Sequence, residues 1–155
     1  MLNQYQDVFR CLKKHDVRYV VIGGIAAVLH GVPRATFDLD LLIDATGSNA
    51  TRLLAALTEA KIGTATLTTS DRVLANEITI FKDRIRIDVL TRTLGLSFDE
   101  AWQRRETMFH GDQEFFVVSV DDLIAAKLAS GREIDLSDVS ALQADLDSSS
   151  ESDKA

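Results

Sequence analysis

Residues 19–44 read YVVIGGIAAVLHGVPRATFDLDLLID, and they contain two predicted strands separated by a glycine pair and a short helix. The apolar, β-branched run Tyr19–Ile22 is typical of a buried strand, which Gly23-Gly24 interrupts. Ile25–His30 then has the composition of a short helix. In Asp38–Asp44, polar and apolar side chains alternate, which predicts a second strand with its aspartates on one face.

The aspartates of this second strand are the first candidates for chemistry. Side chains two residues apart on a strand share a face, so Asp38 and Asp40 are expected to lie roughly 6.5 Å apart. Unpaired carboxylates that close repel each other, and a hard divalent cation relieves the repulsion. The run Ile85–Leu90 predicts another strand, on which Arg86 and Asp88 share a face. If the two strands are neighbours, the three carboxylates suit a two-metal site for phosphoryl displacement.

The glycine pair offers a place for an anion close to these carboxylates. Glycine lets the backbone approach a ligand, and N–H groups at the start of a helix favour anions, so Gly23 and Gly24 are candidates for a nucleotide contact. Arg34 and Thr36 precede the strand that begins at Asp38. Arg34 has two interpretations of equal weight: it contacts a phosphate, or it pairs with an aspartate.

The remaining pattern predicts a mixed α and β domain with a sheet as its platform. Helices are expected at Asn3–His15, from the N-cap Ser48 to Ala60, from Ser97 to Arg105, and at Val120–Ser130 and Asp135–Leu146; further strands are expected at Val73–Phe81 and Glu114–Val118. We expect one domain over residues 1–146 and a disordered, acidic and Ser-rich tail over residues 147–155.

Composition excludes several classes of function. The 155 residues are 46% hydrophobic, enough for an ordinary globular core. The single cysteine, Cys11, excludes a disulfide framework and a multi-cysteine metal site within one chain. A formal charge of −7 argues against broad nonspecific binding of nucleic acid. No signal peptide or membrane span is recognisable, so a cytoplasmic location without a membrane partner is expected.

These motifs resemble a known family. Gly23-Gly24, followed after thirteen residues by Asp38-Leu-Asp40, is similar to the signature of the nucleotidyltransferase superfamily related to DNA polymerase β. The wider stretch Val21–Asp40 resembles the bacterial branch that contains the AbiEii-type toxins of toxin–antitoxin systems and their small uncharacterised relatives. The segment Asp121–Arg132, with Asp135 and Asp138 after it, resembles the C-terminal pattern of that branch.

The resemblance covers roughly residues 3–146. It implies an α+β fold, with a nucleotidyltransferase-like mixed sheet flanked by helices and further helices at the C-terminus. It also implies transfer of a nucleoside monophosphate from a nucleoside triphosphate to a hydroxyl acceptor, with release of pyrophosphate. Asp38 and Asp40 would then coordinate Mg²⁺ or Mn²⁺. Asp88 would complete the metal site and help to deprotonate the acceptor.

The same resemblance implies a nucleotide-binding set and a group of partners. The nucleotide-binding set comprises Gly23, Gly24, Arg34, Thr36 and Lys127. The acceptor would be RNA (tRNA among the candidates), a protein or a small molecule. A toxin role would add a cognate antitoxin as a partner.

Simpler interpretations stay open at this point. Asp88 can be a charged residue of an edge strand, and Lys127 can be a solvated lysine on an amphipathic helix. Arg132, Asp135 and Asp138 are more simply a loop ion pair and a helix cap. Arginines between residues 84 and 105 form either an RNA-binding patch or, as we favour, a surface spread. The whole domain can also be a catalytically silent module that binds nucleotide and metal for regulation or partner recruitment.

Overall fold

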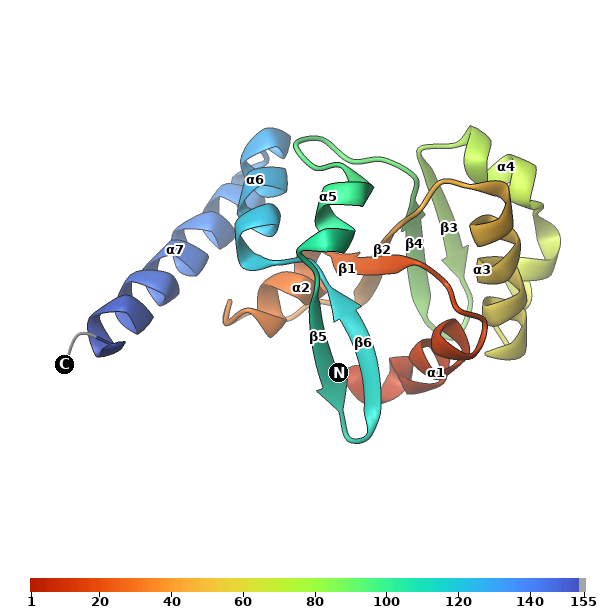
Figure 1. Ribbon diagram of the computed structural model, residues 1–155, viewed down its shortest axis with the longest axis horizontal. Coiled ribbons are helices and arrows are strands. Elements are labelled where there is room, and N and C mark those ends of the chain that lie inside the picture. Colours follow the sequence, from red (N-terminus) through yellow and green to blue (C-terminus); the bar gives the residue numbers. More distant parts are fainter. Residues whose placement is uncertain (154–155) are drawn as a thin grey trace.

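The computed structural model describes the backbone of residues 1–153 and the side chains of residues 1–148. Within these residues the strands form one six-stranded mixed sheet (Figure 1). Its spatial order is β3-β4-β2-β1-β6-β5. The strands are β1 (Tyr19–Ile22), β2 (Asp38–Ile43), β3 (Ile78–Lys82), β4 (Arg86–Leu90), β5 (Glu106–His110) and β6 (Gln113–Val117).

The centre of the sheet mixes parallel and antiparallel pairs. Strand β2 lies between β1, to which it is antiparallel, and β4, to which it is parallel. Strand β1 is parallel to β6 on its other side. The two edges are antiparallel hairpins, β3 with β4 and β5 with β6. The α+β class and the mixed sheet flanked by helices are therefore as the sequence predicts.

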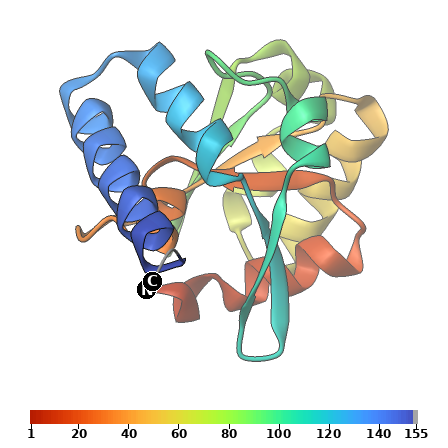
Figure 2. The same ribbon diagram turned by 60° about the vertical axis from the view of Figure 1, so that its left-hand side comes forward.

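Helices cover both faces of this sheet. They are α1 (Gln6–Lys14, after the 3-10 turn η1, Leu2–Tyr5), α2 (Gly23–Leu29), α3 (Gly47–Glu59), α4 (Ser70–Ala75, after the 3-10 turn η2, Gly63–Leu67), α5 (Phe98–Gln103), α6 (Val120–Ser130) and α7 (Glu133–Asp153). Helices α1 and α3 pack together on one side with α4 beside α3, and α2, α6 and α7 lie on the other (Figures 1 and 2).

Side-chain alternation on the central strands separates the core from the site. On β2, Leu39 and Leu41 are fully buried, whereas Asp38 and Asp40, which alternate with them, stay partly exposed. Strand β4 repeats the pattern, with Ile87 and Val89 buried. Burial of these apolar side chains stabilises the sheet, at about 1.5–3 kcal/mol for a large aliphatic group. The same register therefore fixes which way the aspartates face.

The predicted strand Val73–Phe81 is wrong in its first half. The Thr69 hydroxyl accepts a hydrogen bond from the Arg72 N–H and caps helix α4, so that Val73 is buried in a helix. The strand itself begins at Ile78. Several threonines lie close together in this stretch, so the sequence does not show which of them caps a helix.

Two other boundaries differ from the prediction. Helix α3 is capped by Thr46, which accepts from the Asn49 N–H, so the helix begins before the predicted cap Ser48. Strand β5, Glu106–His110, was not predicted at all. Its apolar members are partly exposed, and Phe109 is 64% exposed, so the strand carries no clear buried alternation.

The last helix is longer than the prediction. Helix α7 begins at Glu133 and continues to Asp153, through most of the segment expected to be disordered; residues 154–155 lie outside the described residues. In Figure 1, α7 extends away from the sheet toward the C-terminus. Nowhere in the described part of the chain is a helix both long enough and apolar enough to cross a membrane.

Candidate functional site

The three predicted carboxylates meet on one face of the central sheet. In the parallel pair of β2 and β4, Asp40 lies directly opposite Asp88, and Asp38 lies opposite Arg86. Residues that are partners in a ladder point to the same face, so the shared face extends across both strands. The structure thus places Asp38, Asp40 and Asp88 on one face of two neighbouring strands, which is the arrangement expected if those strands pair.

Asp40 carries the clearest electrostatic mark of this cluster. Burial raises the pKa of its carboxyl group to about 7, and the nearby charges of Asp88 and Asp38 add to the rise. Arg86 and Arg132 act in the opposite direction. A hard divalent cation prefers carboxylate oxygens and removes this repulsion, so the donor set fits Mg²⁺ or Mn²⁺ in its chemistry.

Gly23 closes one side of the cluster. Its φ of +72° is in the left-handed region, and a Cβ built on it would lie 2.1 Å from Asp40 Oδ2. A larger residue would therefore force the Asp40 carboxylate to move. Gly24 is similarly confined, because a Cβ there would lie 2.7 Å from Thr36 Oγ1 and 3.1 Å from Arg34 Nη2. The glycine pair is therefore packed against both the carboxylates and the segment that leads into β2.

Asp88 already has a cationic partner. Arg86 Nε donates to Asp88 Oδ1 at 2.9 Å, and Nη2 donates to Oδ2 at 3.1 Å. Arg86 Nε also lies 3.8 Å from Asp38 Oδ2. Among the side chains of residues 1–148, no three acidic, His or Cys groups converge in an arrangement ready to hold a metal ion. The two parallel hydrogen bonds from Arg86 to Asp88, which we call the fork, engage both oxygens of that carboxylate with the guanidinium.

A cavity of about 200 Å³ opens beside the carboxylates. Asp40, Asp88 and Gly23 line it, together with residues of helix α6 and of the loop before α5. Part of its lining is apolar, including Leu90 and Leu96. An apolar wall next to a few convergent polar groups is the usual make-up of a small-molecule site.

Lys127 lines the cavity, but its ammonium group is already occupied. Its Nζ lies 3.1 Å from Asp135 Oδ1 and 2.8 Å from Asp138 Oδ2, and the side chain is only 5% exposed. Burial by itself would raise the pKa of Asp138, but hydrogen bonds from Arg34 and Lys127 outweigh it and lower that pKa. Lys127 is thus a buried member of an ion network, in contrast to a solvated lysine.

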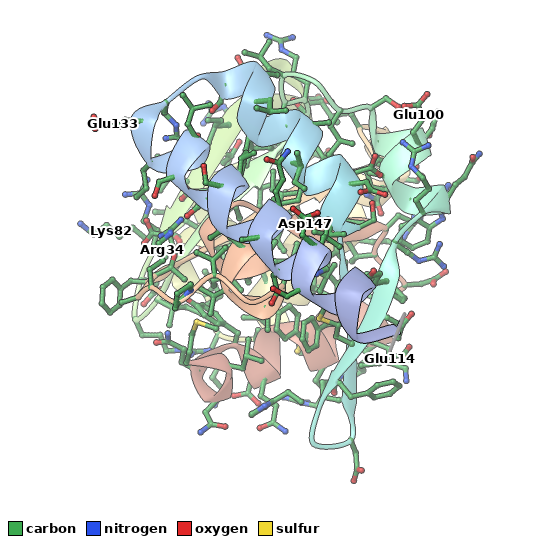
Figure 3. The ribbon with its side chains drawn as sticks, turned by 90° about the vertical axis from the view of Figure 1, so that its left-hand side faces the viewer. Arg34, Lys82, Glu100, Glu114, Glu133 and Asp147 are labelled. Carbon is green, nitrogen blue, oxygen red and sulfur yellow. The ribbon has the colours of Figure 1, made fainter. Side chains whose placement is uncertain are left out.

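Arg34 belongs to the same network. Its Nε and Nη2 each lie 2.9 Å from an oxygen of Asp138, so of its two interpretations the structure shows the ion pair with an aspartate. That aspartate is on α7, and Figure 3 shows Arg34 beside this helix. The contact ties the segment before β2 to the C-terminal helices.

Arg132 is a site residue that the sequence analysis did not assign to the site. It lines the cavity, its charge lowers the pKa of Asp40, and its Nε lies 2.7 Å from Asp135 Oδ2. Its side chain is 73% exposed. The feature of the sequence that could have pointed to Arg132 is Gly131, a typical helix-ending residue. Gly131 ends α6 in the left-handed conformation, with a φ of +67°, and the chain reverses just before Arg132.

Comparison with known proteins places the chain in a family. No curated protein matches it. A family model matches residues 2–148, almost the whole length, and its family is described as a nucleotidyltransferase of unknown function. This match confirms the prediction of a nucleotidyltransferase. The chain belongs to the family of nucleotidyltransferases of unknown function (DUF6036).

Proposed function

We propose that this protein is a metal-dependent nucleotidyltransferase that moves a nucleoside monophosphate from a nucleoside triphosphate to a hydroxyl acceptor. One observation carries the proposal: Asp38, Asp40 and Asp88 share a sheet face, with Asp40 and Asp88 directly opposite each other. These three carboxylates would hold Mg²⁺ or Mn²⁺, which supplies charge neutralisation at the phosphates when bound.

The proposed reaction is an in-line displacement at the α-phosphorus. The acceptor oxygen forms a bond to this phosphorus, the bond from phosphorus to the oxygen that bridges to the β-phosphate breaks, and pyrophosphate leaves. The acceptor proton passes to Asp88. Such a displacement depends mainly on positioning and on charge stabilisation, which a fixed cluster of carboxylates and cations provides.

The cavity suggests how the nucleotide would lie. Gly23 and Lys127 line the cavity, so they would lie nearest the phosphates. Gly24, Arg34 and Thr36 would support the nucleotide from the segment beside Gly23. Lys127 and Arg34 are held by Asp138, so their contribution would be a fixed positive field. Arg132 is the more accessible cation, at 73% exposed, and is suited to direct phosphate contact. The apolar part of the cavity would accept the base.

Transfer of label tests this proposal. The purified protein is incubated with Mg²⁺, each α-labelled nucleoside triphosphate in turn, and total RNA or protein from a bacterial cell. We expect label in an acceptor and its loss in the Asp38→Asn variant or with a chelator. Asp112→Asn, in the exposed turn of the β5–β6 hairpin, is the matched control and should retain transfer. Absence of label from every acceptor fraction would contradict the proposal.

We extend the proposal to two further predictions: that the protein belongs to the AbiEii-type branch, and that it acts as a toxin. If the protein is a toxin, its expression should arrest growth, and Asp38→Asn should relieve the arrest. Co-expression of the product of an adjacent gene, the cognate antitoxin, should also restore growth. The acceptor would then be an RNA, with tRNA among the candidates, or a protein. Normal growth during expression of a soluble, folded protein would contradict the toxin role and leave the transferase proposal standing.

A catalytically silent binding module is the second candidate. The observation that favours it is the pairing of predicted site residues with each other: Arg86 with Asp88, and Lys127 with Asp135 and Asp138. Calorimetry separates the two functions. Tight binding of a triphosphate with Mg²⁺, together with no transfer to any acceptor, would favour the silent module.

A further inference from the structure

The proposed reaction assigns no role to Arg86. We infer that Arg86 is a built-in counter-ion that holds Asp88 until a metal–triphosphate complex displaces it. The inference rests on the proposed function, because it concerns how the proposed site is loaded. It implies that metal alone binds weakly and that the triphosphate enables metal binding.

The first step is the geometry of the fork. Both oxygens of Asp88 accept from Arg86, at 2.9 and 3.1 Å, and the Asp88 side chain is only 15% exposed. The same Nε lies 3.8 Å from Asp38 Oδ2, so the guanidinium is positioned between two of the three carboxylates. An arginine fork on a carboxylate is among the stronger side-chain contacts in proteins. Asp88 is therefore satisfied without a metal ion.

The second step is competition. A divalent ion ligated by Asp88 would share the carboxylate with a guanidinium only a few ångströms away, and two cations at that distance repel. The ion and the guanidinium would also compete for the same carboxylate charge, because both oxygens of Asp88 already accept a hydrogen bond from Arg86. Metal binding is therefore weakened while Arg86 holds Asp88, and it is strengthened when the guanidinium moves away.

The third step is where Arg86 goes. Its side chain is 39% exposed, so it can move without opening the core. In the sheet register Arg86 lies between Lys82 of β3 and Asp38 of β2, and Lys82 projects outward from the molecule (Figure 3). A triphosphate brings several negative charges to this row. It offers the guanidinium a new partner at the moment when the metal takes Asp88.

Binding of Mn²⁺ alone tests the inference without any catalytic readout. Titrations followed by electron paramagnetic resonance compare the wild type with Arg86→Ala and Arg86→Gln. We expect both variants to bind Mn²⁺ about tenfold more tightly, the worth of a lost charge-assisted hydrogen bond. Arg104→Ala is the matched control, because Arg104 makes a similar fork on Asp122 away from the carboxylate cluster. Its affinity for Mn²⁺ should equal that of the wild type.

A second titration adds a nonhydrolysable triphosphate. The wild type should then gain more affinity for Mn²⁺ than Arg86→Ala does, because only the wild type has a cation to transfer to the phosphates. Equal Mn²⁺ affinity of wild type and both Arg86 variants would overturn the inference and leave the proposed function intact. If no protein binds Mn²⁺, with or without the triphosphate, the metal-dependent function itself fails. Circular dichroism of each variant confirms that the comparison is between folded proteins.

Discussion

At the scale of single residues, Asp40 shows how the site is maintained at a cost to stability. Its carboxyl group has a pKa of about 7, well above the ordinary aspartate value of 3.8, because it is buried and faces Asp88 and Asp38. The folded protein therefore keeps the proton to a higher pH than the unfolded chain does. This favours the folded state below pH 3.8, and the advantage is lost as pH rises through about 7.

The Asp40→Asn variant should remove this pH dependence. In metal-free buffer at pH 8, its free energy of unfolding should exceed the wild-type value by about 2–4 kcal/mol, because the ionised carboxylate is gone. Near pH 4 the two proteins should be about equally stable. Urea denaturation at both pH values measures this. A variant that is less stable than wild type at pH 8 would show that Asp40 makes a stabilising contact as an anion.

Gly23 supplies a second residue-scale prediction, with a control inside the chain. Gly23 and Gly111 both have positive φ, at +72° and +59°, but a Cβ at Gly111 meets no atom within 4 Å. Gly111→Ala should cost about 1 kcal/mol of stability, from the backbone conformation alone. Gly23→Ala has the same strain and also pushes Asp40 aside, so it should lose more stability, and nucleotide transfer with it. Equal stability losses in the two variants would exclude the clash with Asp40.

Spacing in the sequence was enough to predict that Asp38 and Asp40 share a face, because strand alternation is a local property. That Asp88 lies on the same face depends on the pairing of β2 with β4, which the sequence left as a condition. The sequence did not reveal that Arg86 would donate two hydrogen bonds to Asp88, although both residues were predicted to share a face. Which rotamer an arginine adopts depends on its surroundings across strands. The partners of Lys127 were similarly hidden, because Asp135 and Asp138 reach it only after the chain turns at Gly131.

At the scale of elements, the buried ion network joins α6, α7 and the segment before β2. Lys127 is its centre, and its partners Asp135 and Asp138 are 5% and 2% exposed. Each aspartate also has an arginine, Arg132 and Arg34 respectively. A network of this kind fixes the position of the helices over the cavity. It matters for the site because the cavity wall belongs to α6.

Lys127→Met should destabilise the protein by about 2–4 kcal/mol, because it leaves two buried carboxylates short of a cation. The control is Lys14→Met, which breaks the pair with Glu59. That pair is short, at 2.6 Å, but its side chains are 61% and 36% exposed. Its loss should cost less than about 1 kcal/mol. Thermal and urea denaturation compare the two; similar losses would mean that burial adds nothing to the contribution of Lys127.

Elements that the sequence predicted well are those with strong local signals. Strand β1 and helix α6 have their predicted bounds, and helix α5 starts at Ser97 as predicted. The elements that were predicted wrongly have weak local signals. Val73 is apolar and β-branched yet lies in a helix, and β5 is an edge strand whose partner β6 decides its conformation. Tertiary pairing of this kind is not encoded in a short window of sequence.

At the scale of the whole molecule, the sheet centre holds the carboxylates and the C-terminal helices close over them. The order β4-β2-β1 puts Asp88, Asp40 and the Gly23 turn side by side, although β4 is far from the other two in sequence. Helix α7 contributes through its first half. Of its described side chains, the buried ones are Asp135, Asp138, Val139 and Leu142. The second half is therefore expected to matter less to the fold.

Two truncations test this division of α7. A chain that ends at Leu146 keeps every buried side chain that the structure describes, so its melting temperature should stay within about 2 °C of the full chain. A chain that ends at Arg132 exposes the surface that Val139 and Leu142 cover and leaves Lys127 without its aspartates. Its melting temperature should fall by more than about 10 °C. If the two truncated chains have the same melting temperature, α7 is not part of the cooperative unit. The network centred on Lys127 then does not hold the cavity wall in place.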